Sequence, residues 1–189
     1  MDDLTKLGSL YRTYVSEGGT FHAGLVACAQ FDGTWEIPVI PGTNCIPEGL
    51  VPFDQVLSKS SFNHFVHFYM DDERFERIWK RSVAYLDRLS KFQGVISPDF
   101  SLYRDLPLGM QVWNTYRGRA LGYWLSRQGL EVISNVRWGD ERATPSALTA
   151  YSRESRSQSE PTGVFVGRTT AAISVSDWRR CSRGCIHPS

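Results

Sequence analysis

Residues 65–97 read FVHFYMDDERFERIWKRSVAYLDRLSKFQGVIS, and this stretch decides the fold. Its first part, Phe65–Met70, is a short apolar and aromatic run that is typical of a buried strand. Apolar side chains then recur at steps of three and four residues, which predicts an amphipathic helix carrying Phe75, Ile78, Trp79, Val83, Leu86 and Leu89 on its buried face. Gly94–Ser97 (GVIS) is a second short strand, which ends at Pro98.

The same alternation continues downstream. Pro107 suits the first turn of a further helix, and Gly129 suits its end. Leu130–Val136 (LEVISNV) then predicts a third strand. Strands that alternate with helices favour parallel pairing through right-handed crossovers. We therefore expect an α/β fold with a parallel-strand core of alternating strands and helices, in the form of an incomplete barrel or an open sheet.

The residues before this core have a different character. Ile37–Pro52 (IPVIPGTNCIPEGLVP) is rich in Pro and Gly. Proline removes a backbone donor and restricts the residue before it, so this segment is expected to be extended and turning. We expect an N-terminal wrapping segment over residues 1–58, an α/β core over 59–142, and a poorly ordered tail over 143–189.

Composition and charge exclude several classes of protein. The chain is 41% hydrophobic and 13% aromatic, so it can bury a core. No apolar run approaches the ~18 residues that span a bilayer, and the N-terminus lacks the order of a secretory signal. We expect a cytoplasmic protein with no membrane partner. Residues 1–142 hold 15 Lys and Arg against 17 Asp and Glu, which gives no strong nucleic-acid signature.

Familiar chemical motifs are also missing. The cysteines (Cys28, Cys45, Cys181 and Cys185) are few and unevenly spaced, which favours free thiols over disulfides or a zinc site. The sequence has no glycine-rich phosphate loop, no dinucleotide fingerprint and no nucleophile elbow.

Polar residues that follow the predicted strands are the candidate functional residues. Ligands bind at the carboxyl ends of the strands in parallel α/β sheets. Carboxylates gathered there can ligate Mg²⁺ or serve as general acid and base. On this basis the catalytic candidates are Asp71, Asp99, Arg137 and Asp140. The metal candidates, with Mg²⁺ as the cofactor to test, are Asp71, Asp72 and Asp99.

Three further residues are candidates for ligand binding. Asn114 and Arg117 sit one turn apart on the second predicted helix, and Trp138 follows the third strand. A structural alternative stands beside this interpretation, in which Arg117 pairs with Asp99 or Asp105 and fixes the helix to the strand end.

The other candidates have structural alternatives too. Asp72 suits the cap of a helix, and Asp99 suits the turn after Pro98. Arg137 and Trp138 can form a stacking pair.

Several segments resemble a phage and bacterial family known as domain of unknown function four-four-one-seven. The matching segments are CIPEGLVPFD (Cys45–Asp54), HFYMDD (His67–Asp72), GVISPDFS (Gly94–Ser101), WNTYRGRALGYW (Trp113–Trp124) and NVRWGDER (Asn135–Arg142). The resemblance covers roughly 100 of the 189 residues. It implies an uncharacterised protein of phages or mobile elements, and it carries no activity.

The resemblance also bears on the tail after Arg142. Family members continue with a segment like YPFCFDGI, five further residues and VAIGTHGC, which this chain lacks. When the third base of each codon is read with the first two of the next, Ala143–Tyr151 and Arg156–Val164 can encode both strings in that spacing. We therefore expect the tail to be translated from a shifted frame. Out-of-frame residues were never selected to pack, so their order would be poor.

Two classes of function remain open on the sequence alone. The first is an enzyme with an acidic, metal-dependent strand-end site that acts on a phosphoester. The second is a non-catalytic accessory or binding protein whose polar rim recognises a partner. Under either hypothesis we expect the 189-residue form to be inactive, because it lacks the two later segments.

Overall fold

The computed structural model describes residues 22–137 and the backbone of residues 165–166 and 172–173. Within these residues a four-stranded parallel sheet holds, in spatial order, β3 (Leu50–Pro52), β4 (Phe65–His67), β5 (Gly94–Ile96) and β6 (Val132–Ile133). The predicted α/β fold with a parallel-strand core is confirmed. The described part of the sheet is open rather than closed into a barrel.

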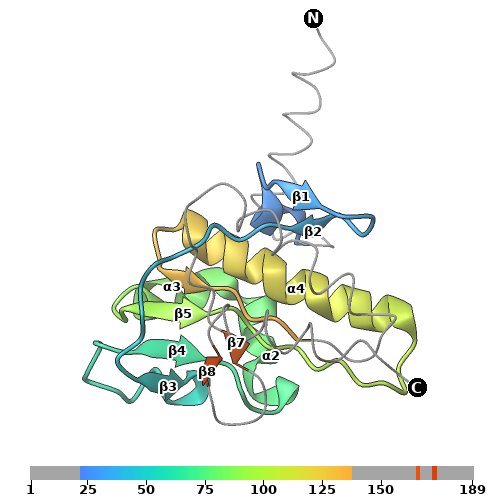
Figure 1. Cartoon of the computed structure of the whole chain (residues 1–189). Coiled ribbons are helices and arrows are strands. Elements are labelled where there is room, and N and C mark those ends of the chain that lie inside the picture. Colours follow the sequence, from blue (N-terminus) through green and yellow to red (C-terminus); the bar gives the residue numbers. More distant parts are fainter. Residues whose placement is uncertain (1–21, 138–164, 167–171, 174–189) are drawn as a thin grey trace, which may run out of the picture.

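Helices form the crossovers between the strands, as Figure 1 shows. The crossover from β4 to β5 contains α2 (Asp72–Lys80) and α3 (Ser82–Leu89), and the crossover from β5 to β6 contains α4 (Leu108–Arg127). The shorter described elements are η1 (Ala23–Val26), η2 (Phe53–Gln55), and two antiparallel pairs, β1 (Phe31–Asp32) with β2 (Ile37–Pro38) and β7 (Phe165–Val166) with β8 (Ala172–Ile173).

The first predicted helix is interrupted in the structure. Arg81 has φ −144° and ψ 50°, outside the helical region, so the helix stops and restarts at Ser82. The break rotates α3 relative to α2, and Val83 is 73% exposed. The prediction that Val83 lies on the buried face was therefore wrong, because a single helical period does not run through the break.

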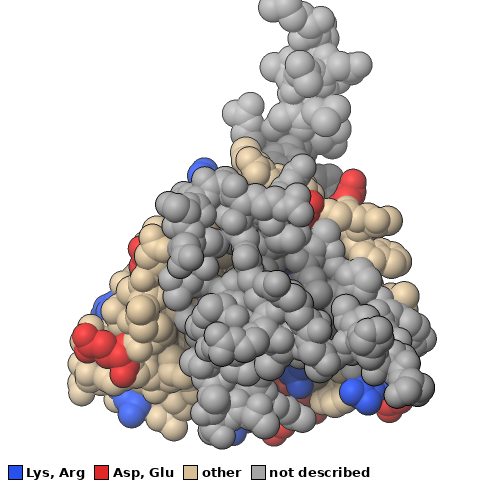
Figure 2. Space-filling view, viewed as in Figure 1, with Lys and Arg blue, Asp and Glu red and all other residues tan. Residues whose placement is uncertain are grey.

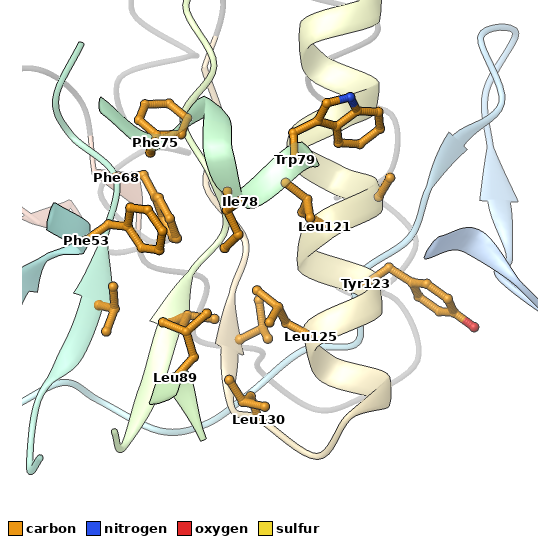
Figure 3. Packing of buried hydrophobic residues seen from close by; sticks show 14 of the residues in the cluster. Phe53, Phe68, Phe75, Ile78, Trp79, Leu89, Leu121, Tyr123, Leu125 and Leu130 are labelled. Carbon is orange, nitrogen blue, oxygen red and sulfur yellow. The ribbon is translucent and has the colours of Figure 1, made fainter. Parts of the chain in front are cut away.

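One face of the sheet carries the main hydrophobic core. Val51, Val66, Val95 and Val132 lie side by side in the register of the four strands. They belong to the same buried cluster as the inward residues of all three helices, among them Phe75, Ile78, Leu89, Leu121 and Leu125. Figure 3 shows these helical side chains meeting in one layer. Both helical crossovers therefore cover the same face.

The opposite face carries a smaller cluster. Phe65, Ile96 and Ile133 are at most 4% exposed, and each is next in sequence to a core valine, so they point the other way. Cys45 and Tyr69 pack against them. This face, called the second face below, is formed by strand residues without a contribution from the described helices.

The segment before β3 lies along α4. Tyr123 donates a hydrogen bond from its hydroxyl to the carbonyl of Ala27 at 3.1 Å, and Gly122 leaves room for the side chain of Ile40. β3 itself, the last part of this segment, lies at one edge of the described sheet. The prediction of an extended, turning path agrees with this geometry.

Two features of the surface are plain. Among the described residues, no helix is long and apolar enough to cross a membrane. On the face drawn in Figure 2, the visible charged side chains of both signs are scattered over the described residues.

Candidate functional site

The carboxyl ends of β4, β5 and β6 lie side by side and hold a chain of hydrogen-bonded polar groups. Tyr69 donates from its hydroxyl to Oδ1 of Asn135 at 3.4 Å, and Nδ2 of Asn135 donates to Oδ1 of Asp99 at 2.8 Å. Arg137 donates from Nη1 to the second oxygen of Asp99, also at 2.8 Å. We call these four residues the strand-end network. Tyr69 and Asp99 lie in the loops that follow β4 and β5, and Asn135 and Arg137 lie in the extension of β6.

Local structure explains why the network forms. Tyr69 lies two residues after His67 and shares its face of the extended chain, and Asn135 stands in the same relation to Ile133. The Oγ of Ser97 accepts a hydrogen bond from the backbone N–H of Asn135 at 2.8 Å, which extends the pairing of β5 and β6 beyond the ladder. Parallel strands thus bring residues that are far apart in sequence to one edge.

Asp99 supplies the carboxyl group of the network. Its side chain is only 12% exposed. Burial raises the pKa of Asp99, and the nearby carboxylate of Asp72 adds to this rise. The positive charge of Arg137 and the hydrogen bonds from Asn135 and Arg137 oppose the rise without cancelling it. Asp99 is therefore a carboxyl group that holds its proton more tightly than an ordinary aspartate.

The same surroundings also shift the pKa of Tyr69. Burial, together with the charge of Asp99, raises the pKa of the Tyr69 phenol. The phenol therefore keeps its proton at neutral pH and acts as a hydrogen-bond donor to Asn135.

A small hollow opens beside Asp99, between the sheet end and α4. Its volume is about 20 Å³, enough for about one water molecule. Polar residues that line it are Ser97, Asp99, Asn114, Thr115, Arg119, Asn135 and Arg137. Gly118 forms part of its wall, and a Cβ there would lie 2.6 Å from the carbonyl oxygen of Pro98. The glycine thus allows α4 to approach the strand end closely.

Asp72 ties the loop after β5 to α2. Its carboxylate accepts hydrogen bonds from the backbone N–H of Ser101 at 3.0 Å and from the Ser101 hydroxyl at 2.8 Å. The N-cap of α2 is Asp71, which makes no side-chain capping hydrogen bond. The alternative in which Asp72 caps the helix was therefore wrong, because Asp72 is already the first helical residue.

Asn114 and Arg117 hold the same loop to α4. Asn114 donates from Nδ2 to the carbonyl of Ser101 at 2.7 Å and accepts from Arg117 at the same distance. Arg117 pairs with Glu76 of α2 at 2.9 Å, and its guanidinium lies 3.9 Å from the centroid of the Phe100 ring. The predicted pairing of Arg117 with Asp99 or Asp105 was wrong, because α2 places Glu76 within its reach. Asn114 lines the hollow, and Arg117 does not.

Comparison with known proteins identifies the family. The family model for DUF4417, a domain of unknown function, matches residues 29–163. This chain is a DUF4417 protein. The resemblance seen in its sequence motifs is thereby confirmed.

Two curated phage proteins are similar to this DUF4417 chain. The gene 1 protein of Mycobacterium phage D29 is 34% identical over 114 residues, which are 59% of this chain and 41% of that protein. The gene 1 protein of Mycobacterium phage L5 is 33% identical over 119 residues, which are 61% of this chain and 50% of that protein. The chain thus spans about half the length of the curated relatives it matches. No solved structure matches it significantly.

The predicted site residues of this DUF4417 domain are only partly brought together. Asp99 and Arg137 form one ion pair, whereas Asp71 and Asp72 lie at the start of α2. Asp140 and Trp138 lie outside the described residues, as does the proposed stacking of Arg137 on Trp138.

The predicted Mg²⁺ ligands Asp71, Asp72 and Asp99 have other contacts in the structure or none that an ion would share. Within the described part of the chain no three His, Cys, Asp or Glu side chains are grouped as metal ligands. The oxygens of Asp72 are engaged by Ser101, and those of Asp99 by Asn135 and Arg137. The assignment of Mg²⁺ to Asp71, Asp72 and Asp99 stays a prediction.

Sequence reasoning did not select some residues of this DUF4417 site. Tyr69, Ser97 and Asn135 lie at or after the carboxyl ends of strands, and their mutual contacts cannot be read from the sequence because the pairing of the strands sets them. Arg119 was not singled out, yet it is 3% exposed, lines the hollow and donates to the hydroxyl of Ser134. Its position one helical turn after Thr115 was the available signal.

Proposed function

We propose that this phage-type DUF4417 domain is part of an enzyme that uses Asp99 as a general acid and base at the strand-end network. The observation that carries the proposal is the placement of one buried carboxyl group with a raised pKa beside a hollow of water size. A carboxyl group whose pKa moves towards neutral is better matched to proton transfer at physiological pH. The carboxyl ends of parallel strands are where such sites form.

The other residues of the network support Asp99. Arg137 holds one oxygen of the carboxyl group and Asn135 holds the other, so its orientation is set. Tyr69 fixes the amide of Asn135, because the phenol donates to Oδ1 and leaves Nδ2 to face Asp99. The proton exchanged in a reaction would therefore sit on a carboxyl oxygen beside the hollow.

We propose a phosphoester as the substrate class; the hollow itself holds about one water molecule, so a phosphate group would lie at its opening. Arg119 and Arg137 line the hollow together with one carboxyl group, and Ser97 and Thr115 add hydroxyls. Guanidinium groups and hydroxyls are common partners of phosphate oxygens. No step of the proposal passes through a metal ion.

The domain boundaries and the reading frame of the chain are also part of the proposal. We infer that residues 1–58 wrap the core of residues 59–142, and that the reading frame is shifted after Arg142. The family match extends past Arg142 to residue 163. Sequencing of the coding DNA is therefore the measurement that locates the shift. A chain restored to the other frame from Ala143, called the frame-restored chain below, is then the active form, and the 189-residue chain is inactive.

Hydrolysis of a chromogenic phosphodiester, bis(p-nitrophenyl) phosphate, tests this function. The frame-restored chain should turn it over, and Asp99→Asn should lower the rate by about 100-fold or more, the usual contribution of a general acid or base. Asp87→Ala is the matched control, because this carboxylate is exposed on α3 and does not line the hollow. Turnover by the 189-residue chain, or full activity in Asp99→Asn, would contradict the proposal.

The same proteins test the predicted cofactor. Titration with Mg²⁺ and Mn²⁺ by calorimetry should show millimolar or tighter binding that is lost in Asp71→Ala and Asp99→Ala, if these carboxylates are ligands. Activity without bound metal would leave acid–base catalysis and remove Mg²⁺ from the proposal.

A non-catalytic accessory or binding protein is the second candidate. It is favoured by the way the network residues satisfy one another and by a hollow that admits only about one water molecule. A frame-restored chain that folds, binds no metal and hydrolyses no phosphodiester would favour this candidate.

We infer that the protein acts in the cytoplasm of the host cell. The two cysteines in the described part of the chain, Cys28 and Cys45, are free thiols, as is usual in a reducing compartment.

A further inference from the structure

The carboxyl end of β4 holds a histidine that contacts the strand-end network without belonging to it. His67 is the last residue of β4, and its Nδ1 accepts a hydrogen bond from the backbone N–H of Tyr69 at 3.2 Å. The two rings also stack, with their centroids 5.3 Å apart and an angle of 21° between their planes. His67 therefore holds both the backbone and the ring of Tyr69.

Tyr69 carries this contact into the network. Its hydroxyl donates to Oδ1 of Asn135 at 3.4 Å, and Nδ2 of Asn135 donates to Asp99 at 2.8 Å. The first of these bonds is longer than most O–H···O hydrogen bonds, so a small displacement of the Tyr69 ring is enough to break it. The position of Tyr69 thus determines whether the amide that orients Asp99 is itself held.

The hydrogen bond at Nδ1 requires a neutral imidazole. An unprotonated ring nitrogen accepts a hydrogen bond, whereas both nitrogens of a protonated imidazole are donors. Because Nδ1 of His67 accepts from Tyr69, the single ring proton of the neutral form lies on Nε2. A second proton would go to Nδ1 and point at the N–H of Tyr69. The imidazole then has to turn away, or Tyr69 has to move.

The charges around His67 determine when this happens. Burial lowers the pKa of His67, and the carboxylate of Asp54 in η2 works against the shift. Asp54 in turn pairs with Arg74 of α2. The strands that flank β4, β3 and β5, hold no titratable residue, and Tyr69 keeps its proton. His67 is therefore neutral at physiological pH and becomes charged only in acid.

We propose that neutral His67 is a positioning residue for the strand-end network, and that its protonation in acid releases Tyr69 and misaligns Asn135 and Asp99. The regulation of catalysis by this switch rests on the proposed function of Asp99. The coupling between His67 and Asn135 does not, because it is a property of the hydrogen bonds and the ring contact alone.

Solution NMR of the 189-residue chain tests the coupling without any catalysis. The imidazole signals of His67 and the side-chain amide signals of Asn135 are followed from about pH 8 to about pH 4, a range that brackets histidine protonation. The Asn135 amide should shift at the midpoint of the His67 imidazole. This step should be absent in His67→Asn, whose side-chain oxygen can still accept from Tyr69 but does not titrate. A separate step caused by Asp99 is recognised because it persists in that variant.

His22→Asn is the matched control for this titration, because His22 packs against Trp79 and lies outside the network. The step at Asn135 should be retained in it. An Asn135 amide that does not respond at the His67 midpoint, or that responds equally in His67→Asn, would overturn the proposal. If His67→Asn does not fold, the two midpoints within the unsubstituted chain still decide the matter.

A pH profile of the frame-restored chain separates this proposal from the proposed function. The acid limb of kcat/KM for bis(p-nitrophenyl) phosphate should move to lower pH in His67→Asn, whereas Asp99→Asn should lower the rate across the whole profile. An acid limb that does not move would overturn the role of His67 and leave catalysis by Asp99 standing. Absence of turnover would contradict the proposed function, and the NMR titration would still decide the coupling.

Discussion

Asp99 shows how one residue takes its properties from its neighbours. From its place in a turn after proline, this aspartate would be expected to have an ordinary pKa. Here the loop after β5 buries it against Asn135 and Arg137, and burial outweighs the favourable charge of the guanidinium. The consequence is a carboxyl group whose protonation is coupled to folding.

The coupling at Asp99 gives a pH dependence of defined sign. Because the folded state holds the proton more tightly, the stabilisation is present at low pH and is lost as pH rises from the unfolded value of 3.8 through the raised pKa. Urea unfolding of Asp99→Asn at several pH values should lack this decline. An unchanged pH slope in the variant would show that another group causes it.

His67 should act in the opposite direction. Burial lowers the pKa of His67, although the charge of Asp54 works against the shift. Its Nδ1 also accepts a hydrogen bond from the backbone N–H of Tyr69 at 3.2 Å, which requires that nitrogen to be unprotonated. The stabilisation is present above the unfolded value of 6.5 and is lost as pH falls through the lowered pKa.

His67→Asn tests this assignment, since an asparagine oxygen can replace Nδ1 as acceptor but does not titrate. The variant should lose the decline in stability below pH 6.5, measured by urea unfolding. A decline that persists in His67→Asn would exclude His67 as its source.

At the scale of elements, the loop after β5 is the joint between α2, α4 and the strand ends. Asp72 binds it from α2, Asn114 binds it from α4, and Gly118 lets α4 come close to Pro98. The hydrogen bonds of Asp72 and Asn114 and the close approach at Gly118 hold the loop after β5 against both helices. This loop forms part of the wall of the hollow, so the same contacts keep that wall in place.

The neighbouring residues Asp71 and Asp72 allow a matched test of the hydrogen bonds between Asp72 and Ser101. Asp72→Ala leaves the nearly buried N–H of Ser101 without this acceptor, which should cost about 1–3 kcal/mol of the free energy of unfolding. Asp71→Ala should change it by less than about 0.5 kcal/mol, because no side-chain cap is lost. Equal effects in chemical denaturation would argue against the structural role of Asp72.

Two glycines of α4 allow a second matched test. Gly118→Ala would place a methyl group 2.6 Å from the Pro98 carbonyl oxygen, so we expect a loss of about 1–3 kcal/mol from overpacking. Gly109→Ala meets no atom within 4 Å and should instead stabilise the helix by up to about 1 kcal/mol. Thermal unfolding compares the two. Stabilisation by both would mean that the close approach at Gly118 is absent in solution.

At the scale of the whole molecule, the four described strands of the main sheet are all parallel and follow one another in space in the order of the chain. Its main core lies on the helical side, whereas the described residues that pack against the second face are Cys45 and Tyr69.

Under the proposed frame shift, the frame-restored chain should unfold with a larger denaturant m-value than the 189-residue chain, because it would bury segments that the 189-residue chain lacks and m increases with the surface exposed on unfolding. Urea titration followed by circular dichroism measures both. Identical m-values for the two chains would mean that the additional residues do not join the folded core.

The sequence by itself determined the alternation of three strands with helices, their parallel pairing and the family, whereas β3 was predicted only as part of an extended segment. These depend on local periodicity, on proline and glycine at the ends of elements, and on short motifs, all of which are properties of neighbouring residues. The tertiary structure alone decided that Arg117 pairs with Glu76, that the first helix breaks at Arg81, and that Tyr69, Asn135, Asp99 and Arg137 form one network. The physical reason is that such partners are set by strand register and helix packing, which join residues far apart in the chain.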